Sequence, residues 1–389
     1  MLTIKNAQLV DANGSYQADI QLKDGKIFAI GQDLTGGEEI NAKGLVCMPA
    51  FVEPHAHFRD PGFPQKEDLE SGSRSALQGG YGTVHLMANT KPTVDNPETY
   101  HYIMNKANEL GLINILQTYA VTKGLEGEEF VDLETLPESV TTLSEDGHGL
   151  FNNKATYELF ERVKEKDLLL MIHEEDKELS EIDYRLAEDV HTMRDVYFSG
   201  KTGARIHFCH VSTVDALEAI AHGKEKGYPV TMEVAPHHIY LKDLDYKVHP
   251  PIRAQEDVNA LVQGILDGTV DCIATDHAPH TAEDKEKGSP GLIGLETAFG
   301  VTYHVLVEQY GQDLSLVSQL MSQRPAEILN LNKGLLQVGY DADLVLVDLN
   351  ESTTYDTFAS RSNNTPFINQ TFPTKIMKTI VNGQVKFER

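Results

Sequence analysis

The middle of the chain alternates short apolar segments with segments of helical periodicity. The helical patterns include KATYELFERVKEK, TVDALEAIAHGKEKG and EDVNALVQGILDG, and the last of these ends at a glycine, a helix stop signal. Nearly continuous apolar strands separated by amphipathic helices are typical of a parallel sheet covered by helices. The eight apolar segments are GLVCMPAFVEPHAH, GTVHLMAN, INILQTYA, SVTTLSED, LLLMIHEE, RIHFCHVS, PVTMEVAPHH and VDCIATDH.

Eight strand–helix units of this kind predict an α/β fold, namely a closed (β/α)8 barrel of the TIM type. The alternative is a doubly wound open sheet. That fold is disfavoured because no glycine-rich nucleotide-binding loop follows the first apolar segment.

Both ends of the chain have a different pattern from the middle. The first fifty residues contain MLTIKNAQLV and YQADIQLKDGKIFAIG, and the last fifty contain ADLVLVDL and KIMKTIVNGQVKF. Asp-Gly and Asn-Gly within these stretches are hairpin signals. We therefore expect residues 1–50 and 336–389 to form one small composite β domain, a flanking β-sandwich, and residues 51–335 to form the barrel.

The chain is strongly acidic, with 33 Lys and Arg against 59 Asp and Glu and a formal net charge of −26. Recognition of nucleic acid or of an anionic membrane requires clustered Lys and Arg, so this charge argues against both classes of partner. The acidic excess falls in helical stretches such as EEDKELSEIDYRLAEDV, which we interpret as a solvated helix surface.

The cysteine content indicates the compartment. Cys47, Cys209 and Cys272 are too few for a disulfide framework, and each lies in an apolar segment, which predicts reduced thiols in a core. No signal peptide opens the sequence, and no run of about 18 apolar residues could span a bilayer. The sequence therefore predicts a soluble, cytoplasmic protein.

Residues of metal-ligand type gather where the predicted strands end. The carboxyl ends of the strands in such a barrel converge on one face, where the active sites of this fold are built. These residues therefore surround one small volume if the strands are placed correctly. They are His55 and His57 on the first strand, Glu145 and Asp146 on the fourth, His173 on the fifth, His210 on the sixth, His237 and His238 on the seventh, and Asp276 and His277 on the eighth.

The spacing and chemistry of these residues indicate a metal site. Residues i and i+2 of a strand point to the same side, so His55 and His57 can face one ion. Four histidines and two carboxylates suit Zn²⁺ best, with Mn²⁺, Co²⁺ and Fe²⁺ as alternatives. Six ligands exceed the four of a closed structural site. Either two ions share a bridging carboxylate, for which Asp146 is well placed, or one ion keeps an open position.

The alternative interpretation is structural. A single histidine at the end of a strand is more often a hydrogen-bonded packing residue than a ligand. A coincidence of six candidates at the same end of five strands is far harder to explain by packing, so we favour the metal site.

The motifs that contain these residues carry a family resemblance along nearly the whole chain. The chain resembles the amidohydrolase superfamily and, more closely, the bacterial type of dihydroorotase in which an aspartate bridges the metal ions. The motifs ATDHAPHT and GLETAF are the most discriminating. The other motifs are PHAHFRDPG, MANTKP, SEDG, HVST, EVAPHH and the late NNTPF.

The resemblance implies a role for individual residues. Asp276 would be both a metal ligand and the group that moves a proton between the attacking water and the leaving nitrogen of the ring. Arg59, Asn89 and His280 would hold the substrate, chiefly its carboxylate, and Pro290 and Gly291 would lie in a loop that approaches the ring. The implied metal ligands are His55, His57, Asp146, His173, His210 and Asp276.

The same resemblance implies a reaction and partners. The reaction would be the reversible cyclisation of N-carbamoyl-L-aspartate to dihydroorotate, a step of pyrimidine synthesis, with one or two Zn²⁺ ions per chain. A homodimer and association with aspartate transcarbamoylase are both left open.

Three departures from the family pattern bear on specificity. The motif KVHPP places His249 where the family commonly has an asparagine that contacts the ring, so His249 would be the substrate contact at this position. A histidine can donate one hydrogen bond there but lacks the paired geometry of an amide. In addition, Ala88 replaces a common proline, and Glu145 replaces the first aspartate of Asp-Asp-Gly.

Two other functions are weighed against this one. A different cyclic amidase, such as a hydantoinase or an allantoinase, would usually carry a carboxylated lysine at the end of the fourth strand, where this chain has Glu145 and Asp146. A non-catalytic partner of aspartate transcarbamoylase would tend to lose metal ligands, and this chain keeps all six.

Overall fold

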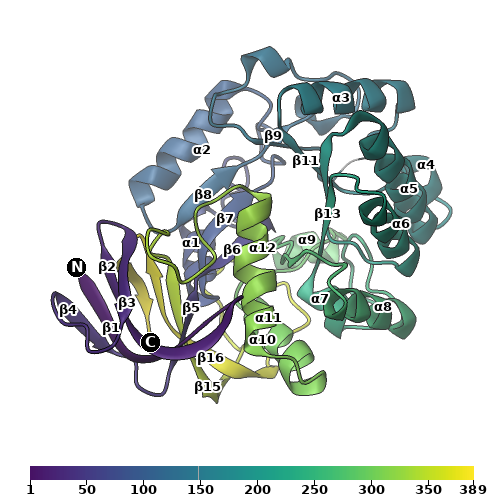
Figure 1. Ribbon diagram of the computed structural model, residues 1–389. Helices are drawn as coiled ribbons and strands as arrows, with labels where there is room; N and C mark the ends of the chain where they lie inside the picture. The colour runs from purple at the N-terminus through teal and green to yellow at the C-terminus, as the bar shows by residue number, and fades with distance from the viewer. Residues whose placement is uncertain (148) are drawn as a thin grey trace.

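The computed structural model describes residues 1–147 and 149–389. Its centre is a ring of short parallel strands with helices outside (Figure 1). Each of the eight predicted apolar segments contains a strand, and the third is interrupted at Thr118. The strands of the ring are β6 (Phe51–Ala56), β7 (Tyr81–Leu86), β8 (Asn114–Gln117), β9 (Tyr119–Ala120), β10 (Thr142–Ser144), β11 (Leu169–Ile172), β12 (Arg205–Phe208), β13 (Val230–Val234) and β14 (Cys272–Ile273).

The strands form two arcs that meet at both ends. One arc is β6-β7-β8 and the other is β14-β13-β12-β11-β10-β9. Strands β8 and β9 are joined through Thr118, and a parallel bridge between Ala56 and His277 closes the opposite seam. There the amide of His57 donates to the carbonyl of His277 at 2.8 Å. The predicted (β/α)8 barrel is confirmed, and the doubly wound open sheet is not the fold.

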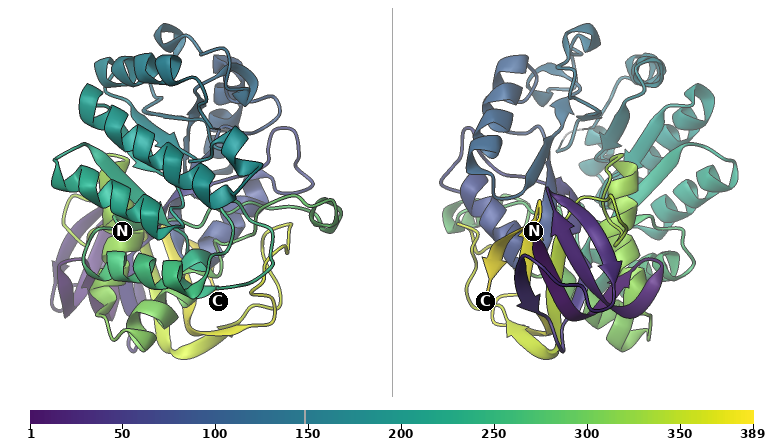
Figure 2. Two further views of the ribbon diagram at one scale, coloured as in Figure 1. Left: turned by 90° about the vertical axis from the view of Figure 1, so that its right-hand side faces the viewer. Right: turned by 60° about the vertical axis from the view of Figure 1, so that its left-hand side comes forward.

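Helices cover the outside of the barrel, as the views in Figures 1 and 2 show. They bury apolar faces against a core that runs through the strands and the inner faces of the helices. The α-helices are α1 (Leu69–Gln78), α2 (Pro97–Leu110), α3 (Asn153–Glu165), α4 (Lys177–Ser180), α5 (Tyr184–Thr202), α6 (Val214–Glu225), α7 (Pro236–Tyr240), α8 (Gln255–Leu266), α9 (Ala282–Glu286), α10 (Ala298–Tyr303), α11 (Leu314–Ser318) and α12 (Arg324–Ile328). Two short 3-10 turns (Lys123–Leu125 and Leu133–Thr135) and two π-helical turns (His304–Gln309 and Gln319–Gln323) complete the helical elements.

Local sequence sets where these helices begin and end, and α2 is an example. Asn96 accepts a hydrogen bond from the amide of Thr99 and caps the helix, and Pro97 occupies the first turn, where its missing N–H costs nothing. Gly111 ends the helix with φ of 54°, a left-handed conformation that favours glycine.

The two ends of the chain form one sheet beside the barrel. Its order is β17-β16-β15-β5-β1-β2-β3, and β4 pairs with β1. Strand β5 joins the two ends because it pairs with β1 on one side and with β15 on the other. The strands are β1 (Leu2–Asp11), β2 (Gly14–Lys23), β3 (Lys26–Gly31), β4 (Glu38–Asn41), β5 (Val46–Pro49), β15 (Leu344–Thr354), β16 (Thr371–Val381) and β17 (Gln384–Glu388).

This sheet has its own apolar core, which includes Ile4, Ile20, Leu344 and Ile380. The predicted flanking unit, rich in sheet and built from both termini, is therefore confirmed. Its predicted limits at residues 50 and 336 stay a prediction. In the described part of the chain, no helix is both long and apolar enough to cross a membrane.

The barrel and the flanking sheet are joined with almost no linker. Only Ala50 separates β5 from β6, and its amide donates to the carbonyl of Asp343 at 2.9 Å. Next along the chain, the ring of Phe51 stacks on Phe299 with centroids 4.9 Å apart and meets Tyr81 edge-on at 5.5 Å. The strand that ends at the site is therefore fixed at its other end by buried aromatic packing.

The close approach at Gly79, just after α1, yields a test of the packing. A Cβ atom on this residue would lie 2.1 Å from the carbonyl oxygen of Leu295, a backbone atom that no side-chain rotation can move away. We expect Gly79→Ala to lower the free energy of unfolding by about 1–3 kcal/mol, the usual cost of overpacking. Urea unfolding measures the change.

The matched control is Gly31→Ala, because the nearest atom to a Cβ there is 3.7 Å away, an ordinary contact. Equal stability of the two variants would show that the chain relaxes around Leu295.

Candidate metal and substrate site

Six residues proposed as ligands from the sequence meet at the carboxyl end of the barrel. Each follows or ends a strand, and all are buried, with 8% or less of their surface exposed. They come from five strands: β10, β11 and β12 are neighbours, β13 separates β12 from β14, and β14 meets β6 at the seam. The residues are His55, His57, Asp146, His173, His210 and Asp276.

One group is formed by His55, His57 and the two aspartates. His55 Nε2 lies 3.4 Å from Asp146 Oδ1, and His57 Nε2 lies 3.4 Å from Asp146 Oδ2. Asp276 Oδ1 lies 3.0 Å from His57 Nε2 and 3.6 Å from His55 Nε2. Two imidazole nitrogens and two carboxylates thus converge on one small volume.

The second group shares Asp146 with the first. His173 Nδ1 and His210 Nε2 lie 3.0 Å apart, and they lie 3.8 and 3.7 Å from Asp146 Oδ1. Two sets of three residues, His55, His57 and Asp146 on one side and Asp146, His173 and His210 on the other, are each compact enough to hold a metal ion. Asp146 Oδ1 thus faces histidines of both groups, Oδ2 faces His57, and the one carboxylate is shared between the two groups.

The residues fit a metal ion. Buried polar atoms almost always have a hydrogen-bond partner. His55 Nε2 and Asp146 Oδ1 are buried, and neither has such a partner among the described residues. A cation placed between the imidazoles and the carboxylates would satisfy both atoms, and nitrogen and oxygen ligands are those that Zn²⁺ and related divalent ions bind.

Two of the six residues have unusual backbone conformations. His210 and Asp276 adopt φ of 34° and 47°, in or near the left-handed region that residues other than glycine rarely occupy. Such conformations cost on the order of 1–2 kcal/mol and persist where the surrounding structure over-determines them, which is typical of functional sites. Here they occur where the chain leaves the barrel after β12 and β14.

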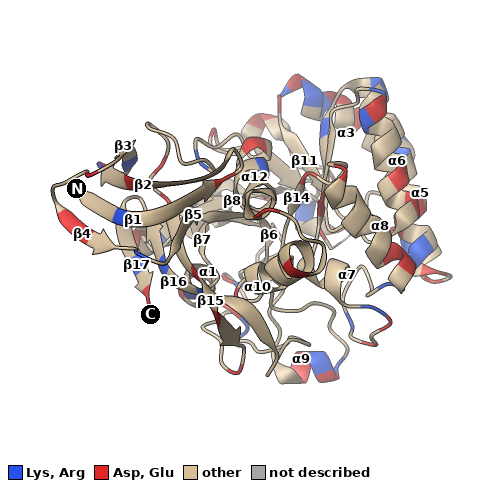
Figure 3. Ribbon diagram, turned by 60° about the horizontal axis from the view of Figure 1, so that its bottom comes forward, with Lys and Arg blue, Asp and Glu red and all other residues tan. Residues whose placement is uncertain are grey.

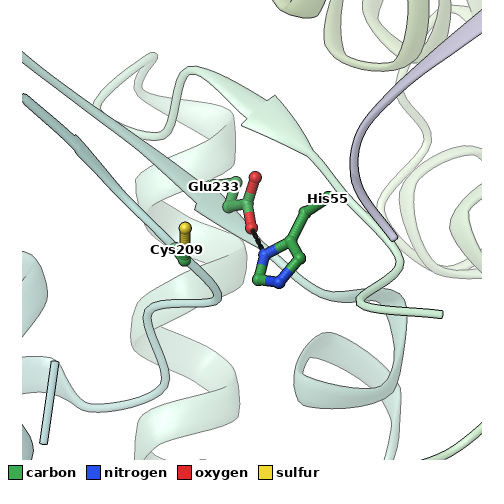
Figure 4. Close-up of side chains that lie close together, drawn as sticks. All are labelled: His55, Cys209 and Glu233. Carbon is green, nitrogen blue, oxygen red and sulfur yellow. Dashed lines mark hydrogen bonds and ion pairs between the residues drawn. The ribbon is translucent and has the colours of Figure 1, made fainter. Parts of the chain in front are cut away.

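The outward nitrogens of the histidines are held by a second layer of polar groups. His55 Nδ1 lies 2.7 Å from Glu233 Oε1, as Figure 4 shows, and His57 Nδ1 lies 2.8 Å from Asn89 Oδ1. His173 Nε2 lies 3.0 Å from Glu175 Oε2. Oxygen acceptors in these places fix the ring orientation and leave the opposite nitrogen free for an ion.

The pKa shifts of Glu233 and Cys209, the two neighbours of His55, show which of them carries a charge. Burial raises the pKa of Glu233, but His55 and His207 outweigh it and hold the pKa below its usual range. Burial raises the pKa of the Cys209 thiol, so this neighbour of His55 and Glu233 stays protonated at neutral pH. Glu233 is thus a charged acceptor, while Cys209 is a packing residue rather than a ligand.

A cavity of about 230 Å³ opens above the ligands. Every residue that the sequence proposed as a substrate contact lines it, together with five of the six proposed ligands; the sixth, His55, is fully buried and does not line it. The predicted residues in its wall are His57, Arg59, Asn89, Asp146, His173, His210, His249, Asp276, His280, Pro290 and Gly291.

A positive charge lies in one wall of this cavity. Burial lowers the pKa of Arg59 to about 10, so its guanidinium stays charged at neutral pH. Arg59 Nη2 and Lys66 Nζ lie 3.4 Å from the two ring nitrogens of His280. Burial and these two cations lower the pKa of His280 to about 3, so the imidazole is neutral there. The wall therefore offers one fixed cation and one neutral polar ring to an anionic ligand.

The loop that carries Pro290 and Gly291 is fastened by one lysine. Lys285, on α9, donates to the carbonyls of Lys247, Ser289 and Gly291 at 2.9, 3.0 and 2.8 Å. These bonds hold the loop against the cavity wall.

Three strand-end histidines do not join the ligand groups. His238 Nε2 lies 3.1 Å from the carbonyl oxygen of Pro250, and His277 Nε2 lies 3.3 Å from Glu67. His237 is buried, which lowers its pKa to about 4. These three histidines therefore belong to the packing around the site.

The sequence reasoning missed several residues of the second layer. Glu175 follows His173 by two residues, the same spacing used to pair His55 with His57, so a signal for it was present. Tyr184, whose hydroxyl donates to Glu175 at 2.7 Å, begins α5 and had no signal. Glu233 lies in the EVAPHH motif, but nothing in the sequence connects it to His55.

Glu233 provides a test of the second layer. We expect Glu233→Gln to weaken the binding of Zn²⁺ by about 10- to 100-fold, because an amide cannot accept hydrogen bonds from His55 and His207 as a carboxylate does. Competition with a chelator measures the dissociation constant.

Glu296→Gln is the matched control, since Glu296 is a buried carboxylate that accepts from the amides of Ala359 and Ser360 and lies outside the cavity. Unchanged affinity in Glu233→Gln would mean that Glu233 has only a packing role.

Comparison with known proteins identifies the family of the chain. The profile of the Amidohydrolase family matches residues 46–386. The dihydroorotases of Clostridium botulinum and Clostridioides difficile are 44% and 37% identical to the chain, and each alignment covers 100% of both proteins.

Solved structures of related enzymes have the same fold. The L-hydantoinase from Arthrobacter aurescens has a TM-score of 0.88 at 24% identity, and the D-hydantoinase from a Thermus species has 0.87 at 25%. Both alignments cover 99% of this chain and 95% of the solved chain. The chain belongs to the metal-dependent amidohydrolase family and, within it, to the dihydroorotases.

Proposed function

We propose that the protein is a metal-dependent dihydroorotase that catalyses the reversible cyclisation of N-carbamoyl-L-aspartate to (S)-dihydroorotate in de novo pyrimidine biosynthesis. The observation that carries the proposal is one cavity that contains both a divalent-ion site and a buried, charged Arg59. A ring that carries a carboxylate and a scissile amide needs both: an electrophilic centre for the amide and a cation for the carboxylate.

We assign the metal ligands as His55, His57, Asp146, His173, His210 and Asp276. The proposed ion is Zn²⁺, which suits imidazole and carboxylate ligands. The sharing of Asp146 between two groups supports two ions per chain. Zn²⁺, when bound, lowers the pKa of a water molecule towards 7 and polarises a carbonyl group.

We assign Asp276 the movement of the proton. Burial raises its pKa, but the contact with His57 and the nearby imidazoles outweigh burial and lower it, so the group is ionised and can accept a proton. Its side chain lies at the floor of the cavity, within 3.0 Å of His57. From there it can take a proton from the attacking water and deliver it to the ring nitrogen that leaves.

The carboxylate of the substrate is assigned to Arg59, Asn89 and His280. The planar guanidinium of Arg59 can bind a carboxylate through two parallel hydrogen bonds. Asn89 Oδ1 lies 2.8 Å from His57 Nδ1, and its amide nitrogen, which has no hydrogen-bond partner among the described residues, can donate to the substrate. His280 lines the same wall with its neutral ring and lies against Arg59, so it can position the guanidinium.

Pro290, Gly291 and His249 are assigned to the ring of the substrate. Pro290 and Gly291 line the cavity on the loop that Lys285 fastens. His249 lies against the ring of Tyr184 with centroids 4.8 Å apart, and burial lowers its pKa. A neutral His249 donates a single hydrogen bond, so it can read one polar atom of the ring where an asparagine would read two.

The main alternative is another cyclic amidase of the hydantoinase or allantoinase type. The likeness to solved hydantoinases concerns the fold, which hosts many reactions. At the end of the fourth strand, Glu145 accepts from the amide of Thr122 at 2.9 Å and Asp146 turns to the histidines. No lysine is available at this position to be carboxylated, which favours the dihydroorotase.

The remaining expectations stay predictions. They are a cytoplasmic location, a homodimer, and association with aspartate transcarbamoylase. A non-catalytic partner of that enzyme would be expected to lack metal, and the preserved ligand set argues against this role.

The proposed activity is tested by following dihydroorotate through the ultraviolet absorbance of its ring, with metal content measured on the same sample. We expect turnover by the zinc-loaded protein. Asp276→Asn should lower kcat by at least about 10²-fold, the lower end of general acid–base contributions.

Three results would contradict the assignment. Bound zinc without turnover, together with hydrolysis of hydantoin or allantoin, would make the protein another cyclic amidase. Absence of both metal and turnover would favour the non-catalytic partner. Wild-type turnover in Asp276→Asn would show that Asp276 does not transfer the proton.

Arg59 tests the binding of the carboxylate. We expect Arg59→Met to raise KM about 10- to 150-fold. This corresponds to a loss of roughly 1.5–3 kcal/mol of binding free energy, the range of hydrogen bonds to charged groups. Arg59→Lys keeps the charge without the planar guanidinium, so its KM should lie between those of the wild type and Arg59→Met. An unchanged KM combined with a loss of metal in Arg59→Met would make Arg59 a structural residue.

A further inference from the structure

The motif NNTPF lies far from the assigned site in the sequence but next to it in the fold. It belongs to residues 355–370, which connect β15 to β16 of the flanking sheet. Its second asparagine, Asn364, is only 7% exposed. The hydrogen bonds of this side chain run to the loop that follows β14 of the barrel. A residue of the flanking unit thus contacts the barrel at the face where the site lies.

The side-chain amide of Asn364 uses both its donors and its acceptor. Its nitrogen donates to the carbonyls of Ala278 and Gly291, both at 3.1 Å, and its oxygen accepts from the amide of His280 at 3.0 Å. An asparagine side chain offers two N–H donors and one carbonyl oxygen. The opposite orientation would set that oxygen against two carbonyls, so the three partners fix how the amide is placed.

The three partners form the two ends of one loop. Residues 278–280 lead out of the barrel after β14, and Gly291 leads back. Between them the loop carries α9, which stands out from the barrel with acidic and basic residues on it (Figure 3). Ala278, His280 and Gly291 all line the cavity. Asn364 therefore ties the wall assigned to the carboxylate to the wall assigned to the ring.

The segment that Asn364 holds also supports Arg59. Arg59 Nε donates to the carbonyl of Pro279 at 3.4 Å, and Arg59 Nη2 lies 3.4 Å from His280 Nε2. Pro279 stands between Ala278 and His280, the two residues of this segment that Asn364 binds. The position of the guanidinium therefore depends on three consecutive residues that Asn364 keeps in place.

The ring side of the cavity has a second support, which the carboxylate side lacks. Lys285 Nζ donates to the carbonyl of Gly291 at 2.8 Å, so Gly291 keeps a partner when Asn364 is changed. Within the described part of the chain, the amide of His280 and the carbonyl of Ala278 have Asn364 as their only hydrogen-bond partner. Loss of Asn364 should therefore act first on the segment that supports Arg59.

The connection that carries Asn364 is itself fixed to the barrel. The amide of Ser360 donates to Glu296 at 3.2 Å, and Ser362 Oγ donates to the carbonyl of Lys66 at 2.8 Å. These two bonds lie within four residues of Asn364 on the same stretch of chain. A side chain on an anchored backbone can hold its partners at a fixed place.

We propose that Asn364 is a positioning residue for the substrate, which holds residues 278–280 so that Arg59 faces the carboxylate. The inference rests on the proposed function, because it concerns the same cavity and the same anionic ligand. Asn364 does not line the cavity, so it acts through Arg59 and His280 rather than on the substrate. The flanking unit thereby takes part in substrate binding.

A purely structural role for Asn364 has different consequences. A buried amide with three hydrogen bonds stabilises the fold, so its loss lowers the free energy of unfolding in either case. A structural role alone would leave the KM of the folded enzyme unchanged. A positioning role makes the effect of Asn364 depend on the presence of Arg59.

Steady-state kinetics with dihydroorotate on the zinc-loaded protein tests the proposal. We expect Asn364→Ala to lower kcat/KM about 10- to 100-fold, chiefly through KM, because a small misplacement of a substrate-binding group costs this much. Asn364→Asp keeps the shape but cannot donate to two carbonyls, so it should show a similar loss and serves as a second variant if Asn364→Ala does not fold. Asn363→Asp is the matched control, because Asn363 is the exposed neighbour, and it should match the wild type.

A double-mutant cycle tests whether Asn364 acts through Arg59. In the Arg59→Met background, Asn364→Ala should lower kcat/KM by less than about 3-fold, because the group that it positions is gone. Equal losses in the two backgrounds would overturn the proposal. A folded, zinc-loaded Asn364→Ala or Asn364→Asp variant with the KM of the wild type would overturn it as well.

Hydrogen exchange of residues 278–281 separates a failure of this inference from a failure of the proposed function. We expect the amide of His280 to exchange about 10-fold faster in Asn364→Ala, where its acceptor is absent, and at nearly the wild-type rate in Asn364→Asp, which keeps an oxygen there. Unchanged exchange in Asn364→Ala would overturn the inference. Faster exchange in a protein that does not turn over dihydroorotate would support the placement of the segment by Asn364 and count against the proposed function alone.

Discussion

The arrangement of the site depends on the buried carboxylate of Asp146. Removing a carboxylate from water costs several kcal/mol unless cations or hydrogen-bond donors replace the water. Here the surrounding imidazoles outweigh the effect of burial and hold the pKa of Asp146 well below its usual range. The charge is therefore retained in the interior, and the four histidines must come together around it. This one requirement explains why residues separated by more than a hundred positions occupy so small a volume.

The barrel supplies the geometry that this carboxylate requires. Parallel strands end at one face, so a ligand at the end of each strand is delivered to the same place whatever its position in the sequence. Two of the ligands are not placed by regular strand geometry, because His210 and Asp276 adopt positive φ just after their strands. The bonds around them, such as that from the amide of His210 to Glu233 at 3.2 Å, help to hold this conformation. Second-layer acceptors thus position both the backbone and the rings.

The sequence could predict the barrel and the residues of the site because both depend on local patterns. Apolar runs that end in His or Asp identify strand ends, and the barrel topology then brings the ends together. The residues of the second layer were harder to predict from the sequence. Glu233 contacts His55 across 178 positions, and Tyr184 reaches Glu175 only because α5 begins where it does. Contacts between distant elements leave no spacing signal in one sequence.

The interpretation of EEDKELSEIDYRLAEDV as a solvated acidic surface was wrong in part, for the same physical reason. Polarity indicates exposure only when no partner lies inside the fold. Glu188 is only 3% exposed, because Arg253 and Ser212, which come from other βα units, donate hydrogen bonds to its buried carboxylate. Leu186 and Val190 then turn outward on the same helix. Periodicity correctly locates the two faces of a helix. Which face is buried is then inferred from polarity, and that inference fails where the buried face carries an ion pair.

The likeness to hydantoinases concerns the fold and leaves the substrate to be argued from the side chains of the cavity. A TM-score of 0.88 at 24% identity means that the barrel and the flanking sheet are preserved while most side chains differ. The residues that we assign to the substrate line a cavity of about 230 Å³. A fixed guanidinium at Arg59 favours an anionic ring over a neutral one, because a buried cation without a partner is costly. Under the proposed function, we therefore expect the charge of this wall, rather than the metal ligands, to select an anionic ring among cyclic amides.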